Sequence, residues 1–392
     1  MIPFARILNY GNTVETALVK DFFLDDANAS PTSWILLSNG ELWGSCSQNY
    51  GYALALPITS PHYGQMYKSA ENVDRAFGST WGTFILTTDN KIMHTGRVYF
   101  YTGNADYVYQ WTDRSSYYPF IASDIKKIVF SAGTVMFLLN DGSVYGHGQN
   151  IYGVLGRGNE TQILTPVLIR SNVNDIWLSG NNGVCQDNDG KFYATGNNSY
   201  RQMQTTSTTN YTSWTQIFSA ATSSVGYVYN AFRNGGTHFM LFSSDRRYFC
   251  SGRNYAGAWG IGNVSVDADV ALYNATLPFE PGNLLSFFGT ANQAYWTNMI
   301  VSIDGTVYYA GYTDGDGSSQ NLTFLPTYTI QGDGNMFRGQ TNTRMFALCA
   351  LGSPPNMYAR GTATTQRNGV GFTPSSTPLG PTYLHITDFN LK

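Results

Sequence analysis

The chain has 392 residues, of which 42% are hydrophobic, 15% are aromatic and only 12% are charged. Ordinary soluble proteins carry about 25% charged residues, and disordered chains are rich in charge and poor in aromatic residues, so disorder is excluded. The 22 basic and 25 acidic residues give a net charge of −3, and without a basic surplus we expect no nucleic-acid partner. The longest apolar run is too short to cross a bilayer and no secretory signal is visible, so we expect no membrane insertion.

A strand-turn-strand pattern recurs along the chain. The clearest copy, residues 135–156, consists of an apolar run, the turn Asp141-Gly142, a second run that ends at Gly148, and then Asn-x-x-Gly. A close copy occupies residues 238–260. With 41 Gly and 28 Tyr, the composition is typical of β-strands joined by tight turns.

Seven copies of the pattern align on the last residue of the second run. These residues, 48 to 59 positions apart, are Cys46, Gly96, Gly148, Gly196, Gly252, Gly311 and Gly361. Turn signals stand before the second runs at Asn39-Gly40, Asp89-Asn90, Asp141-Gly142, Asp189-Gly190, Asp245-Arg246, Asp304-Gly305 and, in degenerate form, Pro354-Pro355. Such pairs predict two-residue hairpins in which both central residues have positive φ. The continuous apolar runs before the turns predict strands that are covered on both faces.

Four short strands in about every 50 residues, without a helical period, predict an all-β fold and specifically a seven-bladed β-propeller. A solenoid would need polar caps at its ends, and the terminal copies are as apolar as the middle ones, so we favour a closed ring. Spare strands are predicted at residues 4–8 and 383–392, and we expect one terminal strand to close the ring, because an unpaired inner edge leaves backbone donors unsatisfied. We therefore interpret residues 1–19 as an N-terminal strand or attachment arm and residues 20–392 as the propeller.

Residues 148–156, Gly-Gln-Asn-Ile-Tyr-Gly-Val-Leu-Gly, resemble the Gly-x-Asn-x-x-Gly-x-Leu-Gly repeat of the regulator of chromosome condensation family, and residues 252–260 match it nearly as well. The resemblance implies a propeller of that type. It implies no single function, since such propellers serve as exchange factors, photoreceptors, enzyme inhibitors and virion parts. The repeat residues for which we expect a structural role are Asp141, Gly142, Gly148, Asn150, Gly153, Gly156, Gly196, Gly252, Asn254, Gly257, Gly311 and Gly361.

The sequence contains no motif that carries catalysis or binds a metal. Its five His lack metal-ligand spacing, and no nucleophile elbow, P-loop or dinucleotide fingerprint is present, so we expect no enzymatic activity, catalytic residue, metal or cofactor. His147 lies at a position that varies between copies, and we expect it to be structural. The four Cys are far apart, and each lies in or beside a predicted strand, which predicts buried free thiols.

The longest departure from the repeat is an aromatic stretch at residues 98–118. Tyrosine and tryptophan combined with Ser, Gly and Asn are typical of recognition surfaces and of sugar stacking. The candidate binding residues are Tyr99, Tyr101, Tyr107, Tyr109, Trp111, Tyr117 and Tyr118. The alternative is that this stretch forms an outer strand and a loop whose aromatic side chains cover the edge of a blade.

The main functional hypothesis is a non-enzymatic virion protein, such as a phage tail, fibre or baseplate propeller that mediates assembly or host attachment. It would be assembled in the host cytoplasm within a larger oligomeric assembly, and its partners would be other virion proteins and a host surface protein or glycan. Low charge, high Tyr and Gly content and the absence of catalytic motifs support this hypothesis. The alternatives are a cytoplasmic protein-interaction propeller, acting as an exchange factor or adaptor, and a secreted-type enzyme inhibitor.

Overall fold

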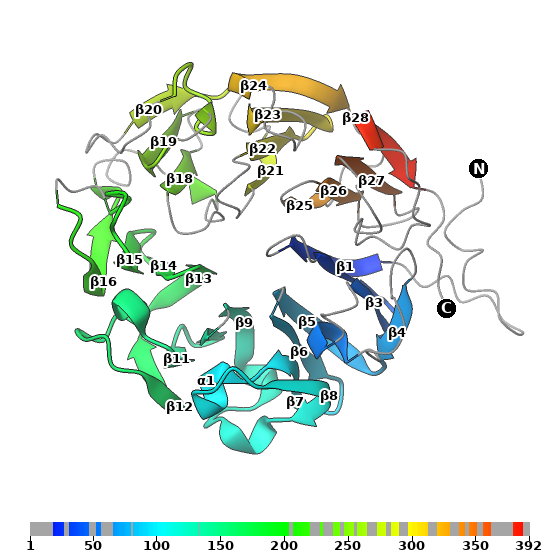
Figure 1. Cartoon of the computed structure of the whole chain (residues 1–392), viewed down its shortest axis with the longest axis vertical. Coiled ribbons are helices and arrows are strands. Elements are labelled where there is room, and N and C mark those ends of the chain that lie inside the picture. Colours follow the sequence, from blue (N-terminus) through cyan, green and yellow to red (C-terminus); the bar gives the residue numbers. More distant parts are fainter. Residues whose placement is uncertain are drawn as a thin grey trace, which may run out of the picture.

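The computed structural model of the chain describes residues 19–26, 31–46, 52–55, 66–79, 81–131, 133–203, 207–219, 228–229, 238–243, 247–254, 257–264, 273–279, 284–289, 297–312, 320–329, 337–341, 345–350, 356–361 and 379–386. Strands dominate these residues and form seven four-stranded antiparallel sheets, each built from consecutive strands. The sheets are arranged around a common centre, and the first strands β1, β5, β9, β13, β21 and β25 of six of them lie nearest to it (Figure 1). The fold is therefore an all-β propeller.

The strands of the first four sheets lie between residues 19 and 217. They are β1 (Val19–Asp26), β2 (Pro31–Leu37), β3 (Leu42–Cys46), β4 (Tyr67–Ala70); β5 (Val73–Ser79), β6 (Gly82–Thr87), β7 (Ile92–Arg97), β8 (Tyr107–Asp113); β9 (Ile125–Phe130), β10 (Thr134–Leu139), β11 (Val144–Gly148), β12 (Ile163–Arg170); β13 (Val173–Ser179), β14 (Asn182–Asp187), β15 (Phe192–Gly196), β16 (Tyr211–Ile217). Short helical turns among them are α1 (Tyr99–Thr102), η3 (Ser115–Tyr117), η4 (Ala122–Asp124) and η5 (Ile151–Gly153).

The other three sheets follow in the same order. They are β17 (Val228–Tyr229), β18 (His238–Ser243), β19 (Arg247–Gly252), β20 (Tyr273–Thr276); β21 (Leu284–Gly289), β22 (Thr297–Ser302), β23 (Thr306–Tyr312), β24 (Gln320–Thr329); β25 (Phe337–Thr341), β26 (Met345–Ala350), β27 (Asn356–Gly361), β28 (Leu379–Ile386). None of the helices in the described part of the chain has the length and apolar character needed to cross a membrane.

The aligned repeat position has one register throughout. In every sheet it pairs with the start of the second strand, and the pairs are Thr32–Cys46, Gly82–Gly96, Thr134–Gly148, Asn182–Gly196, His238–Gly252, Thr297–Gly311 and Met345–Gly361. Gly148 has a φ of 106°, and a Cβ here would collide with the backbone carbonyl of Gly133. Glycine is required at this position because the chain passes this close to the preceding turn.

The core lies between neighbouring sheets. All six residues of β10 are buried, and five of the six in β6 are buried, which confirms the prediction that these apolar strands are covered on both faces. The second and third sheets share one cluster in which Phe84 packs with Phe100, Phe130 and Phe137. Stability therefore comes from contacts between sheets as well as within them.

The turns between the second and third strands differ from the predicted two-residue hairpins. One residue in each described turn has positive φ: Gly40, Asn90, Gly142, Gly190 and Gly305. The preceding Asp or Asn does not, and in three of these turns the side chain of that residue, Asn39, Asp141 or Asp304, forms an Asx turn instead. Asp141 Oδ1 accepts a hydrogen bond from Ser143 N at 2.8 Å, and Asp304 accepts one from Thr306 N at 3.0 Å. The prediction that both central residues have positive φ is therefore wrong.

The expected closure by a terminal strand is also wrong. The last strand, β28, pairs with β27 as the outer strand of the final sheet, because β25 already occupies the inner position. The first and last sheets meet through their inner strands, since β25 contacts both β21 and β1 (Figure 1). The expected N-terminal strand at residues 4–8 lies outside the described residues, and the boundary expected after residue 19 falls inside β1.

Candidate interaction surface

The repeat asparagine fixes the turn after the third strand. Asn150 is buried; its Nδ2 donates to the carbonyl of Asn159 at 2.7 Å, and its Oδ1 accepts from Leu155 N at 2.8 Å. Asn198 and Asn254 make the same two kinds of contact in the fourth and fifth sheets. Because a buried amide must satisfy both its donor and its acceptor, these contacts give the three turns one shape.

This turn packs against the outer strand of the next sheet. Gly153 has a φ of 75°, and a Cβ there would lie 2.5 Å from the Cα of Thr212 on β16. Five residues later, Gly158 N donates to the Thr212 carbonyl at 2.7 Å. Other repeat glycines in such close approaches are Gly156, against Trp214, and Gly257, against Leu322. The repeat glycines are therefore needed where one sheet meets the backbone or a large side chain of the next.

A second set of contacts links each sheet to the one before it. The residue before the aligned glycine uses its side chain to donate to a carbonyl of the preceding turn, at 2.6 to 2.8 Å: Thr95 to Tyr52, His147 to Phe100, Thr195 to Gly153 and Ser251 to Gln202. The sixth sheet has Ala310 at this position, and its cross-strand partner Asn298 donates instead, to the Ala258 carbonyl at 2.7 Å. The hydroxyl and imidazole side chains that recur just before the aligned glycine were the sequence signal for this contact. Asn298 lies at a different repeat position and gave no such signal.

Three of the candidate binding residues lie between the second and third sheets rather than on an open surface. Tyr101 and Tyr118 join their hydroxyls at 2.8 Å, and Tyr118 approaches His147 Nε2 at 3.4 Å. Because the Phe100 carbonyl can only accept, His147 Nδ1 carries the proton and Nε2 accepts from Tyr118. Tyr117 lies beside the same imidazole, 5.5 Å between ring centroids. Burial raises the pKa values of Tyr101 and Tyr118, so these phenols stay neutral.

A second buried imidazole lies in this cluster, and sequence reasoning missed it. His94 is completely buried, and neither of its ring nitrogens has a hydrogen-bond partner among the residues that the structure describes. Burial and, to a smaller extent, the charges of Arg114 and His147 lower its pKa well below the usual range. Burial also lowers the pKa of His147, to about 4. Both histidines are therefore neutral at pH 7, and protonation of either would place a charge in an apolar interior.

The other four candidate residues lie nearer the surface. Trp111 Nε1 donates to the Ser69 carbonyl on the first sheet at 2.8 Å, and the ring centroid of Tyr107 lies 4.3 Å from that of Tyr52. Tyr109 is the most exposed, at 46%. The fourth, Tyr99, is half-buried on α1. The aromatic stretch thus joins three sheets, which is the covering role that the sequence left open as the alternative.

The described residues contain no group of three or more His, Cys, Asp or Glu that could hold a metal ion. Cys185 and Cys250 are buried free thiols, as predicted, and burial raises the pKa of both. The side chains of Cys46 and Cys349 lie outside the described set.

The two ends of the sheets form two unlike faces. We call the end with the turns between second and third strands the hairpin face, and the end with the turns between third and fourth strands the loop face. The hairpin face carries ion pairs, including Lys20–Asp74 at 3.0 Å, Lys127–Asp175 at 2.8 Å and Lys91–Asp89 at 2.9 Å. Six of the seven lysines in the sequence lie at this face, and the seventh, at position 392, is outside the described residues.

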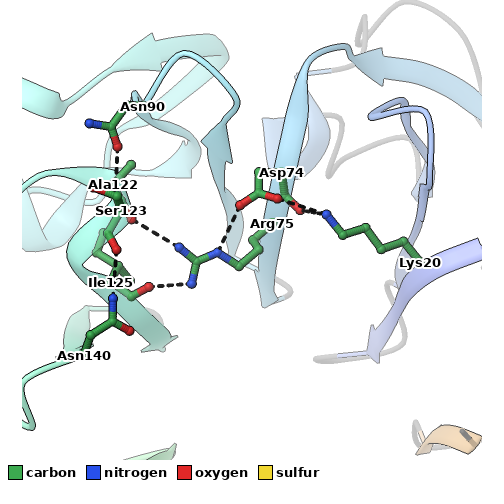
Figure 2. A network of polar contacts seen from close by, with 8 residues as sticks. All are labelled: Lys20, Asp74, Arg75, Asn90, Ala122, Ser123, Ile125 and Asn140. Atoms are coloured by element: carbon green, nitrogen blue, oxygen red, sulfur yellow. Dashed lines mark hydrogen bonds and ion pairs between the residues drawn. The ribbon is translucent and has the colours of Figure 1, made fainter.

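Figure 2 shows one network of the hairpin face, which connects the first three sheets. Lys20 on β1 donates to the carbonyl of Asp74 on β5 at 2.6 Å, and Asp74 faces the guanidinium of Arg75 at 3.4 Å. Arg75 in turn donates to the carbonyls of Ala122 and Ile125 at the start of the third sheet. The charges of this network therefore hold neighbouring sheets together.

The loop face carries arginines instead of lysines. Arg97 ends the third strand of the second sheet, and the loops after the third strands of the third to fifth sheets contain Arg157, Arg201 and Arg253. The guanidinium carbon of Arg97 lies 5.0 Å from the ring centroid of Trp81 and 5.4 Å from that of Tyr99. The guanidinium of Arg253 similarly lies 5.1 Å from the ring centroid of Tyr200 in the preceding sheet.

The repeat geometry just described has a counterpart among known families. Residues 141–178 match the family model of the regulator of chromosome condensation (RCC1) repeat. The matched segment begins at the Asp141 turn and runs into β13, so it covers the Asn150 and Gly153 contacts. No curated protein matches the chain by sequence.

Solved structures resemble the whole fold more broadly. Human WBSCR16 aligns with a TM-score of 0.62 and 15% identity, over 82% of this chain and 86% of its own. Prp20p from Saccharomyces cerevisiae, studied with its binding to Gsp1p and histones, aligns with a TM-score of 0.57 and 13% identity, over 78% and 76%. Yeast RCC1 (Prp20) bound to Kap60 gives 0.60 and 13%, over 81% and 77%. At these identities the similarity establishes the fold, an RCC1-like β-propeller.

The comparisons also bear on the functional hypotheses drawn from the sequence. The similar structures come from yeast and human proteins, two of them from work on binding to other proteins. They give no support to the virion, tail and host-attachment hypothesis.

Proposed function

We propose that this chain is a non-enzymatic protein-interaction propeller of the RCC1 type, in which the seven sheets are the blades of one closed ring. The RCC1 repeat at residues 141–178, in a fold that resembles Prp20p over most of both chains, is the observation that carries this proposal. The contact of β25 with both β21 and β1 supports closure of the ring.

The use of the side chains is consistent with binding rather than catalysis. The repeat Asn, Gly and hydroxyl residues pack sheet against sheet, and the titratable groups between the second and third sheets are held neutral by burial. The loops after the third strands differ in sequence from sheet to sheet and share one face. A rigid scaffold with variable loops on one face is the usual arrangement of a recognition protein.

Reconstitution of a complex from purified components tests the proposal. Candidate partners would be identified by crosslinking the tagged full-length chain in cells and sequencing the crosslinked peptides. We expect at least one candidate to form a complex of fixed stoichiometry with the purified chain in size-exclusion chromatography with light scattering. If no crosslinked candidate forms a complex with the pure protein, the interaction proposal is wrong.

The exchange-factor form of the proposal has its own test. Release of a labelled guanine nucleotide from small GTPases would be measured with and without the full chain. Accelerated nucleotide release would identify the chain as an exchange factor. Unchanged release with all the GTPases tested would exclude exchange activity toward them, and the adaptor role would remain the proposal. Recovery of the chain and its crosslinks from purified virus particles would instead return the virion hypothesis to favour.

A further inference from the structure

The loop face differs from the hairpin face in how its positive charges are balanced. The hairpin face carries seven ion pairs between described residues, from Lys20–Asp74 to Lys191–Asp189. On the loop face, Arg97 and Arg157 form no ion pair with another described residue. The described parts of the arginine-bearing loops contain only two carboxylates, Asp106 and Glu160.

Arg97 is held in place by aromatic rings instead of by carboxylates. It lies close to the rings of Trp81 and Tyr99, its backbone N–H donates to the Trp81 carbonyl at 2.7 Å, and its buried Nε has no hydrogen-bond partner among the described residues. Stacking on aromatic rings fixes the guanidinium plane without using its terminal donors. The residue is only half-buried, so the donor edge remains available to an external acceptor.

The positive charges are spread over the ring rather than gathered in one place. One arginine comes from the loop-face end of each of four successive sheets, and the exposed Arg157 follows Arg97 in this order. The fold thus presents several guanidinium groups on one face, and aromatic rings lie beside those of Arg97 and Arg253. Arginine, Tyr and Trp are the residues most enriched at the energetic centres of protein interfaces.

We infer that the loop face of the second to fifth sheets is a docking surface for a carboxylate-rich segment of a partner protein. This inference rests on the proposed interaction function and adds the chemistry of the partner. A guanidinium pairs with a carboxylate through two parallel hydrogen bonds, and Arg97 and Arg157, which form no ion pair with another described residue, can each pair with one carboxylate of an extended segment. The net charge of −3 and the location of every described lysine at the opposite face argue against nucleic acid, which lysine-rich surfaces attract.

Charge-removal variants on the two faces test the surface. The loop-face variant is Arg97→Gln with Arg157→Gln, and the matched control is Lys91→Gln with Lys191→Gln, which removes the same charge from the exposed hairpin face. Melting temperatures of both proteins are measured first. Binding of a fluorescein-labelled oligoglutamate peptide to the full chain is then followed by anisotropy, with a single-stranded DNA oligonucleotide and an uncharged oligoglutamine peptide as further probes.

We expect oligoglutamate to bind the unmodified chain, oligoglutamine not to bind, and the loop-face variant to weaken the oligoglutamate Kd by about tenfold or more, since each lost charge-assisted pair is worth about that factor. The hairpin-face control should change Kd less than twofold. Arg97→Lys, which keeps the charge but not the planar donor edge, should also bind several-fold more weakly.

Three results would overturn the inference: no oligoglutamate binding, equal weakening by both double variants, or tighter binding of the oligonucleotide than of the peptide at equal salt. Failure of the surface and failure of the proposed function are distinguishable. If a reconstituted partner complex survives Arg97→Gln with Arg157→Gln unchanged, the chain is an interaction protein that uses another face.

Discussion

The turns after the third strands of the second and third sheets perform the same task with different side chains. In the third sheet, the Asn150 amide closes the turn and the Gly153 carbonyl accepts from Thr195 of the next sheet. In the second sheet, α1 takes the place of that turn, and the Phe100 carbonyl accepts from His147. The position of the acceptor is kept, and the donor changes with the shape of the turn.

The two solutions differ in how completely they satisfy buried polar groups. The third-sheet turn pairs both ends of its buried amide and lets the backbone approach the next sheet at Gly153. The second-sheet turn fills the space with aromatic rings and encloses two imidazoles, one of which, His94, has no hydrogen-bond partner at either nitrogen within the described part of the chain. The comparison teaches that the repeat residues build an interface that is insensitive to pH, while the aromatic replacement builds one that acid should weaken.

The largest effect is expected where the third-sheet turn meets the next sheet. Gly153→Val should lower the free energy of unfolding by about 3–5 kcal/mol, because a β-branched residue is strained at positive φ and its side chain would meet the Thr212 backbone. Urea denaturation followed by circular dichroism measures this loss. Gly190→Ala is the control, since Gly190 also has positive φ but its Cβ would meet nothing closer than 3.9 Å; a similar loss in both variants would contradict the packing argument.

The next effect concerns the amide that closes the same turn. Asn150→Ala should cost about 2–3 kcal/mol of unfolding free energy, because it removes two hydrogen bonds and leaves the buried N–H of Leu155 without its partner. Asn254→Ala removes the equivalent contacts in the fifth sheet and should cost a similar amount. A loss below about 0.5 kcal/mol in both variants would show that the amide is not needed for the turn.

Acid should weaken the second-sheet interface selectively. The folded-state pKa values of His94 and His147 are lowered, so the unfolded chain binds more protons below pH 6.5, and stability that is complete above that pH is lost as the pH falls toward about 4. The expected slope is about 1.4 kcal/mol per pH unit for each histidine. Urea unfolding between pH 7.5 and 5 measures it in a range above the pKa values of the carboxylates.

The variant His94→Leu separates this cluster from other titrating groups. It removes one buried imidazole and should reduce the slope by the share of one histidine, whatever its effect on stability at pH 7.5. An unchanged slope would mean that His94 is not the buried, neutral group described above. Gly153 and Asn150 variants should keep the slope of the unmodified chain, because their contacts contain no titratable group.

The smallest effect is expected from the donor between the third and fourth sheets. Thr195→Val keeps the shape of the side chain but removes the hydroxyl that bonds the Gly153 and Tyr211 carbonyls at 2.8 Å. The loss should be about 1–1.5 kcal/mol, the usual net worth of a buried hydrogen bond. Thermal unfolding of this variant beside Thr95→Val tests whether the contact is equivalent in successive sheets, and a gain in stability for either variant would contradict it.

Much of the fold is predictable because the repeat depends on interactions between residues that are close in the sequence. Each aligned residue, from Cys46 to Gly361, pairs with the start of the strand before it, since strand period and turn residues set that register within about 20 residues of chain. The turn prediction failed only in its φ angles, because the sequence does not tell whether Asp141 uses its backbone or its side chain to close the turn.

The candidate site was less predictable. Tyr101, Tyr117 and Tyr118 have the composition of a recognition loop, yet they pack between two sheets around His147. Tyrosine suits both environments, since its ring can be buried while its hydroxyl finds a partner. The sequence did not predict the arginines of the loop face. They are single residues 44 to 60 positions apart, and only the packing of the sheets brings them to one end of the propeller.

The sequence by itself determined the strands, their turns, the repeat register and the propeller class, because hydrophobic period and turn chemistry act between residues close in the chain. Tertiary structure alone decided that β28 is an outer strand, that Asn298 replaces the missing donor at Ala310, and that all the described lysines collect at one face. These features depend on residues from different sheets, which come together only when the sheets pack around one centre. No pattern within a short stretch of sequence predicts such contacts.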